Sequence, residues 1–316
     1  MSHAIMVPVT GQGTVVDQNL STYLPALMQS KFGCSDVFLY SHGWWTTADA
    51  AMVDYSRFSV GFLDQVLLMA QARAGLLPVS LQVGIHWPSV ISEDSESIIS
   101  VLQPLTFYNR AAMADDVGEH GGQSVLRLIL ENVTKGLNIH ILGHSFGCRV
   151  VCSTLVELLK QVPKEKLIPH KFNVVLLQAA FDTDALEPAN GYGSILDSAK
   201  GIPNLRLLVT KSAEDTAVGV QYPRAYKLVH LFGRERTGLG ATGPSANTPG
   251  VAKALSIQVA PNFPVGSAPD VGESNFVIAD LTSLHRDGTV PADSFSGHHS
   301  DIYRDEIYRL ITLFLG

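Results

Sequence analysis

Short apolar runs alternate along the chain with longer segments in which apolar residues recur at the spacing of a helix face. Runs that are apolar throughout are typical of strands buried on both faces of a parallel sheet, whereas recurrence every three or four positions predicts amphipathic helices. The predicted strands are residues 4–9, 13–17, 37–40, 79–87, 139–142, 172–180, 205–209 and 276–281. The predicted helices are residues 48–74, 124–133, 148–159, 223–231 and 301–315.

The order of these elements predicts an α/β fold, in which a mostly parallel central sheet has helices on both faces. The chain contains no internal repeat and no linker-like boundary, so we expect one domain that spans residues 1–316. Residues 89–122 and 233–272 fit the alternation poorly, and the second segment is rich in Gly, Pro, Ser and Ala. Irregular segments of this length are uncommon in compact domains, so we expect them to form a loop-rich cap or lid.

One predicted strand, residues 139–142, leads into the turn Gly143-His144-Ser145-Phe146-Gly147, and a predicted helix follows directly. A Gly-x-Ser-x-Gly turn between a strand and a helix is typical of a nucleophile elbow. Such a turn holds its serine in a strained backbone conformation, and the two glycines stand where a side chain would collide with the strand or the helix. The unpaired N–H groups at the helix start suit a developing negative charge.

Acidic and basic partners for this serine follow later strands. In parallel sheets, functional groups gather beyond the carboxyl ends of the strands. Asp215 follows the predicted strand 205–209, and His299 lies between the last strand and the last helix. A serine hydroxyl needs an imidazole to accept its proton, and the imidazole needs a carboxylate to fix its tautomer. Ser145, His299 and Asp215 are therefore the candidates for a catalytic triad.

Alternatives remain open for the base and for the acid. His298 is adjacent to His299, and two neighbouring side chains cannot both face the serine. Asp182 follows the strand after the elbow helix, and Glu214 is adjacent to Asp215, so each is a further candidate for the acid.

With these motifs in this order, the chain resembles the α/β-hydrolase superfamily of the serine esterase and lipase kind, over about residues 35–316. The matching motifs are Gly143-His144-Ser145-Phe146-Gly147, His42-Gly43, Trp87-Pro88-Ser89 and His299-Ser300-Asp301. Residues 89–122 and 233–272 match no feature of the superfamily, so the resemblance does not indicate a substrate class.

The resemblance also implies roles for individual residues. It favours His299 as the base and Asp215 as the acid, and it implies an oxyanion hole formed by the backbone N–H groups of Trp44 and Phe146. We expect the surrounding substrate pocket to include His42, Gly43, Trp45, Trp87 and His144.

Composition narrows the functional classes. Of 316 residues, 46% are hydrophobic and only 16% are charged, which predicts a large core. The net charge of −7 and the lack of a basic cluster argue against a nucleic-acid partner. The three cysteines, Cys34, Cys148 and Cys152, form no disulfide framework, and we expect neither a metal nor a cofactor. Because the sequence contains no membrane-span pattern and no signal-peptide pattern, we expect a cytoplasmic protein.

These features predict a serine hydrolase that cleaves small-molecule carboxylic esters through an acyl-enzyme on Ser145. A thioesterase, amidase or lipase with the same triad is one alternative, and a non-catalytic hydrolase-like binding protein is another. Related branches with dehalogenase or epoxide-hydrolase activity carry an aspartate at the elbow, so the serine disfavours them. The sequence does not indicate an oligomeric state.

Overall fold

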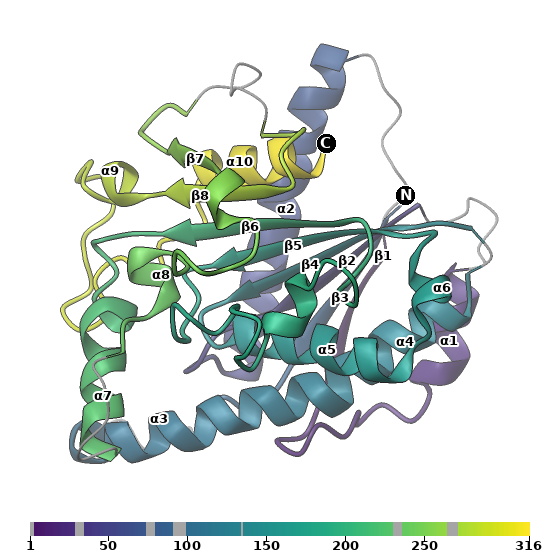
Figure 1. Cartoon of the computed structure of the whole chain (residues 1–316), viewed down its shortest axis with the longest axis horizontal. Helices are drawn as coiled ribbons and strands as arrows, with labels where there is room; N and C mark the ends of the chain where they lie inside the picture. The colour runs from purple at the N-terminus through teal and green to yellow at the C-terminus, as the bar shows by residue number, and fades with distance from the viewer. Residues whose placement is uncertain are drawn as a thin grey trace.

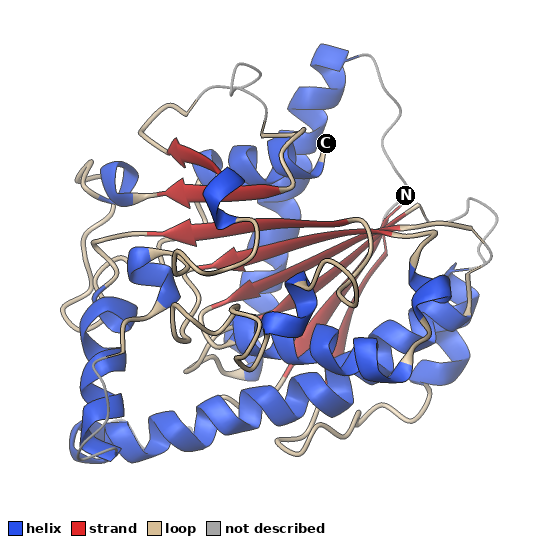
Figure 2. Cartoon of the chain, viewed as in Figure 1, coloured by secondary structure: helices blue, strands red, loops and turns tan. Residues whose placement is uncertain are grey.

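The computed structural model describes residues 3–28, 35–73, 80–90, 99–133, 135–229, 236–263 and 271–316. Its centre is an eight-stranded sheet with the strand order β1-β3-β2-β4-β5-β6-β8-β7 (Figure 2). Every neighbouring pair of strands is parallel. The carboxyl ends of all the strands therefore lie at the same edge of the sheet.

The strands are β1 (His3–Pro8), β2 (Asp36–Ser41), β3 (Ser80–His86), β4 (Asn138–His144), β5 (Lys171–Leu177), β6 (Leu205–Lys211), β7 (Leu255–Gln258) and β8 (Phe276–Asp280). All except β7 overlap predicted strand segments, and the central strands β2, β4 and β5 are buried along nearly their whole length. The prediction of a strand over residues 13–17 is wrong. A turn folds this segment back, and Val15 forms only an isolated antiparallel bridge with Val9.

Helices cover both faces of the sheet (Figure 1). On one face α2 (Ala48–Arg73) packs with α10 (Asp305–Leu315), and on the other lie α1 (Leu20–Met28), α3 (Ile99–Asp116), α4 (Gln123–Glu131) and α5 (Gly147–Gln161). The shorter helices are α6 (Lys164–Leu167), α7 (Tyr222–Val229), α8 (Leu239–Thr242) and α9 (Thr282–His285). The apolar stripe of α10 explains its placement, since Ile307, Leu310, Ile311 and Phe314 are all fully buried.

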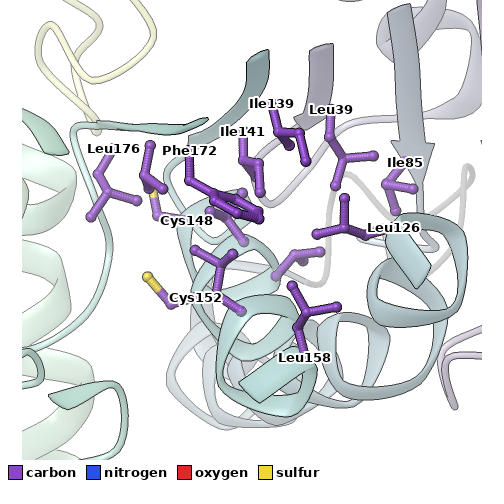
Figure 3. Packing of buried hydrophobic residues seen from close by; sticks show 14 of the residues in the cluster. Leu39, Ile85, Leu126, Ile139, Ile141, Cys148, Cys152, Leu158, Phe172 and Leu176 are labelled. Atoms are coloured by element: carbon purple, nitrogen blue, oxygen red, sulfur yellow. The ribbon is translucent and has the colours of Figure 1, made fainter. Parts of the chain in front are cut away.

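The larger core cluster lies between the sheet and the layer of α4 and α5 (Figure 3). Ile139 and Ile141 of β4 point from the sheet toward this layer, where Leu126 of α4 meets them. Cys148 and Cys152 lie one turn apart in α5 and are buried free thiols. Both side chains belong to the larger core cluster, so they contribute to its packing. This core fixes the start of α5, and with it the turn that carries Ser145.

Both segments that lacked a clear pattern contain regular structure. Within residues 89–122, α3 continues through a π-helical segment, Val117–Gly122, directly into α4, while residues 91–98 lie outside the described part. Within residues 233–272, the described part contains α8, a 3-10 turn (Val251–Lys253) and the edge strand β7. The role of either segment as a lid stays a prediction.

Candidate active site

Ser145 occupies the sharp turn between β4 and α5. Its φ of +56° is a left-handed conformation that non-glycine residues rarely adopt. The turn is held in place because the Ser145 N–H donates to the Leu177 carbonyl at 3.0 Å and the Ser145 carbonyl accepts from the Cys148 N–H at 3.1 Å. A Cβ atom at Gly147 would lie 2.1 Å from the Ser41 carbonyl oxygen, so only glycine fits there. The sheet and the helix together force the strained geometry at Ser145.

His299 and Asp215 meet at the same edge of the sheet. Nδ1 of His299 donates a hydrogen bond to Oδ2 of Asp215 at 2.8 Å. Asp215 is 1% exposed, and its Oδ1 accepts the Val218 N–H at 2.9 Å. The loops that carry the pair are joined by an isolated bridge between Asp215 and Gly297. Because Nδ1–H is committed to the carboxylate, Nε2 of His299 is the ring atom left to accept a proton.

His144 ties the loop of His299 to the elbow. Its Nε2 donates to the His299 carbonyl at 2.9 Å, and the two ring centroids are 4.9 Å apart. Burial lowers the pKa of His144 to about 3, so this ring stays neutral near pH 7. Within the described part of the chain, the Ser145 hydroxyl and Nε2 of His299 form no hydrogen bond with each other. Such contacts are often long in hydrolases without a bound substrate.

The turn after β2 packs directly against the serine. A Cβ atom at Gly43 would lie 2.9 Å from Cβ of Ser145. Nδ1 of His42 donates to the Gly43 carbonyl at 2.8 Å, and burial lowers the pKa of His42 to about 3. In a trans peptide the carbonyl and the following N–H point in opposite directions, so His42 sets the direction of the Trp44 N–H.

The two N–H groups implied as oxyanion donors meet no competing acceptor in the described part of the chain. Neither the Trp44 N–H nor the Phe146 N–H donates a hydrogen bond to any described residue. Phe146 is the N-cap residue of α5, where N–H groups have no partner within the helix. Both donors are therefore available to a negatively charged oxygen beside Ser145.

Aromatic rings from separate elements gather beside this turn. The Phe107 ring of α3 lies 4.8 Å from that of Phe146, 5.8 Å from that of Trp44 and 5.3 Å from that of Tyr222 in α7. We call Trp44, Phe107, Phe146 and Tyr222 the aromatic cluster. Phe107 and Tyr222 were not predicted as site residues, because nothing in the local pattern indicates that α3 and α7 meet.

The other two tryptophans lie in different surroundings. Trp87 is fully buried and stacks on His42 with a centroid distance of 5.5 Å, so it supports the turn from behind. Trp45 is 42% exposed and has a φ of +69°, and its ring centroid lies 5.1 Å from that of Trp44. Of the two tryptophans expected in the substrate pocket, Trp87 is thus buried beneath the turn and Trp45 lies at the surface, while the Trp44 ring lies beside the site.

The alternative acids have other partners. Asp182 forms an ion pair with Arg236 and accepts the Tyr222 hydroxyl at 2.7 Å. Glu214 pairs with Arg286 at 2.6 Å.

The alternative base also lies apart from the serine. The His298 ring stacks on His285 with a centroid distance of 5.2 Å, and its Nδ1 is 3.5 Å from the Asp301 carboxylate. The hydrogen-bonded pair at this site is therefore His299 with Asp215.

The described residues contain no group of three or more His, Cys, Asp and Glu side chains arranged to hold a metal ion. In the same part of the chain, no helix combines the length and the apolar character needed to cross a membrane.

The all-parallel sheet, the layers on both faces and the strained serine between β4 and α5 define an α/β-hydrolase fold. A family model described as "alpha/beta hydrolase of unknown function (DUF900)" matches residues 47–225, more than half of the chain, and the chain belongs to this family of hydrolases. The match includes Ser145 and Asp215 but ends before His299. No curated protein matches the chain.

Proposed function

We propose that the protein hydrolyses carboxylic esters through an acyl-enzyme on Ser145. The observation that carries the proposal is the 2.8 Å hydrogen bond from Nδ1 of His299 to Asp215, beside a serine held at a φ of +56°. This arrangement supports a nucleophile with an imidazole base and a buried carboxylate that orients the base.

In the proposed reaction, Nε2 of His299 takes the proton of the Ser145 hydroxyl while Oγ attacks the ester carbonyl carbon. The N–H groups of Trp44 and Phe146 stabilise the oxyanion of the tetrahedral intermediate. When the C–O bond to the alcohol breaks, His299 returns its proton to the leaving oxygen. His299 then takes a proton from a water molecule, whose oxygen attacks the acyl carbon. When the bond between this carbon and Oγ breaks, His299 gives the proton to Oγ, and the carboxylic acid leaves free Ser145.

The aromatic cluster supports an apolar acyl group of short or medium length as the substrate portion beside Ser145. Large rings bury much apolar area, and rings packed on one another narrow the space next to the oxyanion donors. The apolar rings of the cluster also favour an uncharged acyl group over a strongly charged one at this position.

Labelling with a fluorophosphonate probe tests the proposed nucleophile. We expect one probe molecule per chain, located on Ser145 by mass spectrometry of the digested protein. An unlabelled folded protein would support a non-catalytic binding protein, and an adduct on another residue would exclude Ser145 as the nucleophile.

Substitution within the aromatic cluster tests the proposed acyl site. We expect Trp44→Ala to shift the rate optimum toward longer acyl chains in a series of p-nitrophenyl esters, because the backbone N–H remains while the ring is lost. Trp45→Ala is the matched control, since its ring is partly exposed and should leave the optimum unchanged. An active Trp44→Ala variant with the wild-type optimum would contradict the proposed acyl site.

A further inference from the structure

Gln178 directly follows β5 and is fully buried beneath the proposed triad. Its φ of +44° is left-handed, which is rare for a residue with a side chain. The surroundings fix this conformation, because its N–H donates to Oγ1 of Thr210 at 2.9 Å and the adjacent Ala179 carbonyl accepts the Gly240 N–H at 2.9 Å. Strain that is held in this way is concentrated at functional sites.

The side-chain amide of Gln178 joins two parts of the triad. Its Nε2 donates to Oδ2 of Asp215 at 3.1 Å and to the His298 carbonyl at 3.2 Å. Both partners are acceptors, so the nitrogen and the oxygen of the amide can be told apart from the network. The His298 carbonyl is part of the peptide bond between His298 and His299. The side-chain amide of Gln178 therefore contacts both the proposed acid and the loop that carries the proposed base.

This arrangement does not serve stability alone. Oε1 of Gln178 is buried without a hydrogen-bond partner among the described residues. An unsatisfied buried carbonyl costs stability, and an apolar side chain of the same length would avoid that cost. The residue therefore combines a strained backbone with a buried acceptor that has no partner among the described residues.

We propose that Gln178 is a positioning residue that holds the Asp215 carboxylate and the His299 loop in register for proton transfer. This inference rests on the proposed function of Ser145, His299 and Asp215. Among the described residues, three groups donate to the carboxylate: the Val218 N–H to Oδ1, and both His299 and Gln178 to Oδ2. Of these three donors, Gln178 is the one that also contacts the backbone beside the base.

An amide suits this position because it donates without adding charge. In the part of the chain that the structure describes, the titratable groups that face the His299 ring are Asp215, at 2.8 Å, and His144, whose ring is neutral near pH 7 because burial lowers its pKa. His298, the other titratable neighbour of this amide, faces His285 and Asp301. The Asp215 carboxylate is thus the charged group next to the imidazole. Gln178 fixes the orientation of this carboxylate and, because its amide is neutral, leaves the net charge of the site unchanged.

Two substitutions at Gln178 test the inference in the full-length protein, with a p-nitrophenyl ester as the probe. Gln178→Met keeps the length and removes the donor, so kcat should fall about tenfold while KM stays within about twofold of wild type. Gln178→Glu adds a second carboxyl group beside Asp215. When it is ionised it stabilises the protonated imidazole, so the acidic limb of the kcat/KM profile should move up by about one pH unit.

Asn173→Asp is the matched control. It also replaces a buried amide by a carboxyl group, but on β5 itself and about 16 Å from Gln178, where its partners are His140 and Arg206. We expect its pH profile to match that of wild type. A purely structural role for Gln178 would lower the thermal transition of Gln178→Met and leave its kcat unchanged.

An acidic limb of Gln178→Glu that coincides with that of wild type would overturn the inference. If that variant does not fold, Gln178→Met decides, and a kcat within about twofold of wild type would overturn it. Failure of the proposed function itself is seen separately, as an unchanged rate in Ser145→Ala.

Discussion

In the proposed reaction, proton transfer depends on the orientation of a single imidazole, that of His299. Three contacts determine it: Nδ1 of His299 is bound to Asp215, its carbonyl accepts from His144, and the preceding carbonyl accepts from Gln178. Each contact comes from a different segment of the chain. The side chain of His299 is therefore held by the tertiary structure and not by its own loop alone.

Asp215→Asn should reduce kcat by several orders of magnitude, because an amide cannot hold the tautomer of His299 that leaves Nε2 free. Asp182→Asn is the matched control, since that carboxylate binds Arg236 and Tyr222. Steady-state hydrolysis by the two variants makes the comparison. Equal losses in both, or a larger loss in Asp182→Asn, would move the acid to Asp182.

Two buried histidines make stability depend on pH. Burial lowers the pKa of His42 and of His144 from 6.5 to about 3, so between these values the unfolded chain binds protons that the folded chain does not. Their contribution to the free energy of unfolding is therefore lost as the pH falls from 6.5 toward 3, by about 1.4 kcal/mol per pH unit for each ring.

His144→Gln should remove one of these two contributions while keeping a donor to the His299 carbonyl. Denaturant unfolding at pH 7, 6 and 5 should then give a shallower fall in stability than in wild type. Parallel curves for the two proteins would show that His144 does not titrate with unfolding in this range.

The sequence predicts Ser145, Asp215 and His299 because each follows a strand, and the carboxyl ends of parallel strands meet at one edge. Gln178 also follows a strand, but glutamine has no special place in a triad, so its role depends on distances to Asp215 that only the fold provides. The place of Phe107 and Tyr222 beside the site could not be predicted for the same reason, since the two rings meet only because α3 packs on α7.

At the scale of elements, the turn between β4 and α5 depends on the close approach of two backbones. Gly147→Ala should destabilise the protein by about 3 kcal/mol, because the new Cβ would lie 2.1 Å from the Ser41 carbonyl oxygen and 2.6 Å from that of His42. Thermal and denaturant unfolding measure this cost.

Gly191→Ala is the control for that substitution, since a Cβ atom there meets nothing within 4 Å. We expect its unfolding curve to match that of wild type. A Gly147→Ala variant as stable as Gly191→Ala would contradict the packing of the elbow against β2.

The sequence predicts elements whose apolar residues follow a clear strand or helix pattern, and it does not predict α3 or β7, whose patterns are weak. The apolar run of β5, residues 174–177, and the apolar stripe of α10 can be recognised directly from the sequence, although α10 begins at Asp305 and not at residue 301. The segment that becomes α3 carries Pro104, which weakens a helical pattern. The strand β7 has only four residues, flanked by turn-forming sequence, and it is specified by pairing with β8.

At the scale of the whole molecule, the sheet brings distant parts of the chain to one place. The turn after β2, the elbow after β4, Asp215 after β6 and His299 after β8 all lie at the carboxyl edge of parallel strands (Figure 1). The α/β class and the parallel sheet could be predicted because continuous apolar runs require cover on both faces. The strand order, in which β3 lies between β1 and β2, could not, because it depends on the crossover connections.

The most direct test of the account compares ester hydrolysis by wild type and by Ser145→Ala, with the thermal transition of each protein recorded in parallel. Wild type should hydrolyse a short-chain p-nitrophenyl ester, and the variant should retain less than about a thousandth of that rate with an unchanged transition. A folded Ser145→Ala variant whose rate lies within about tenfold of wild type would contradict the assignment of Ser145 as the nucleophile.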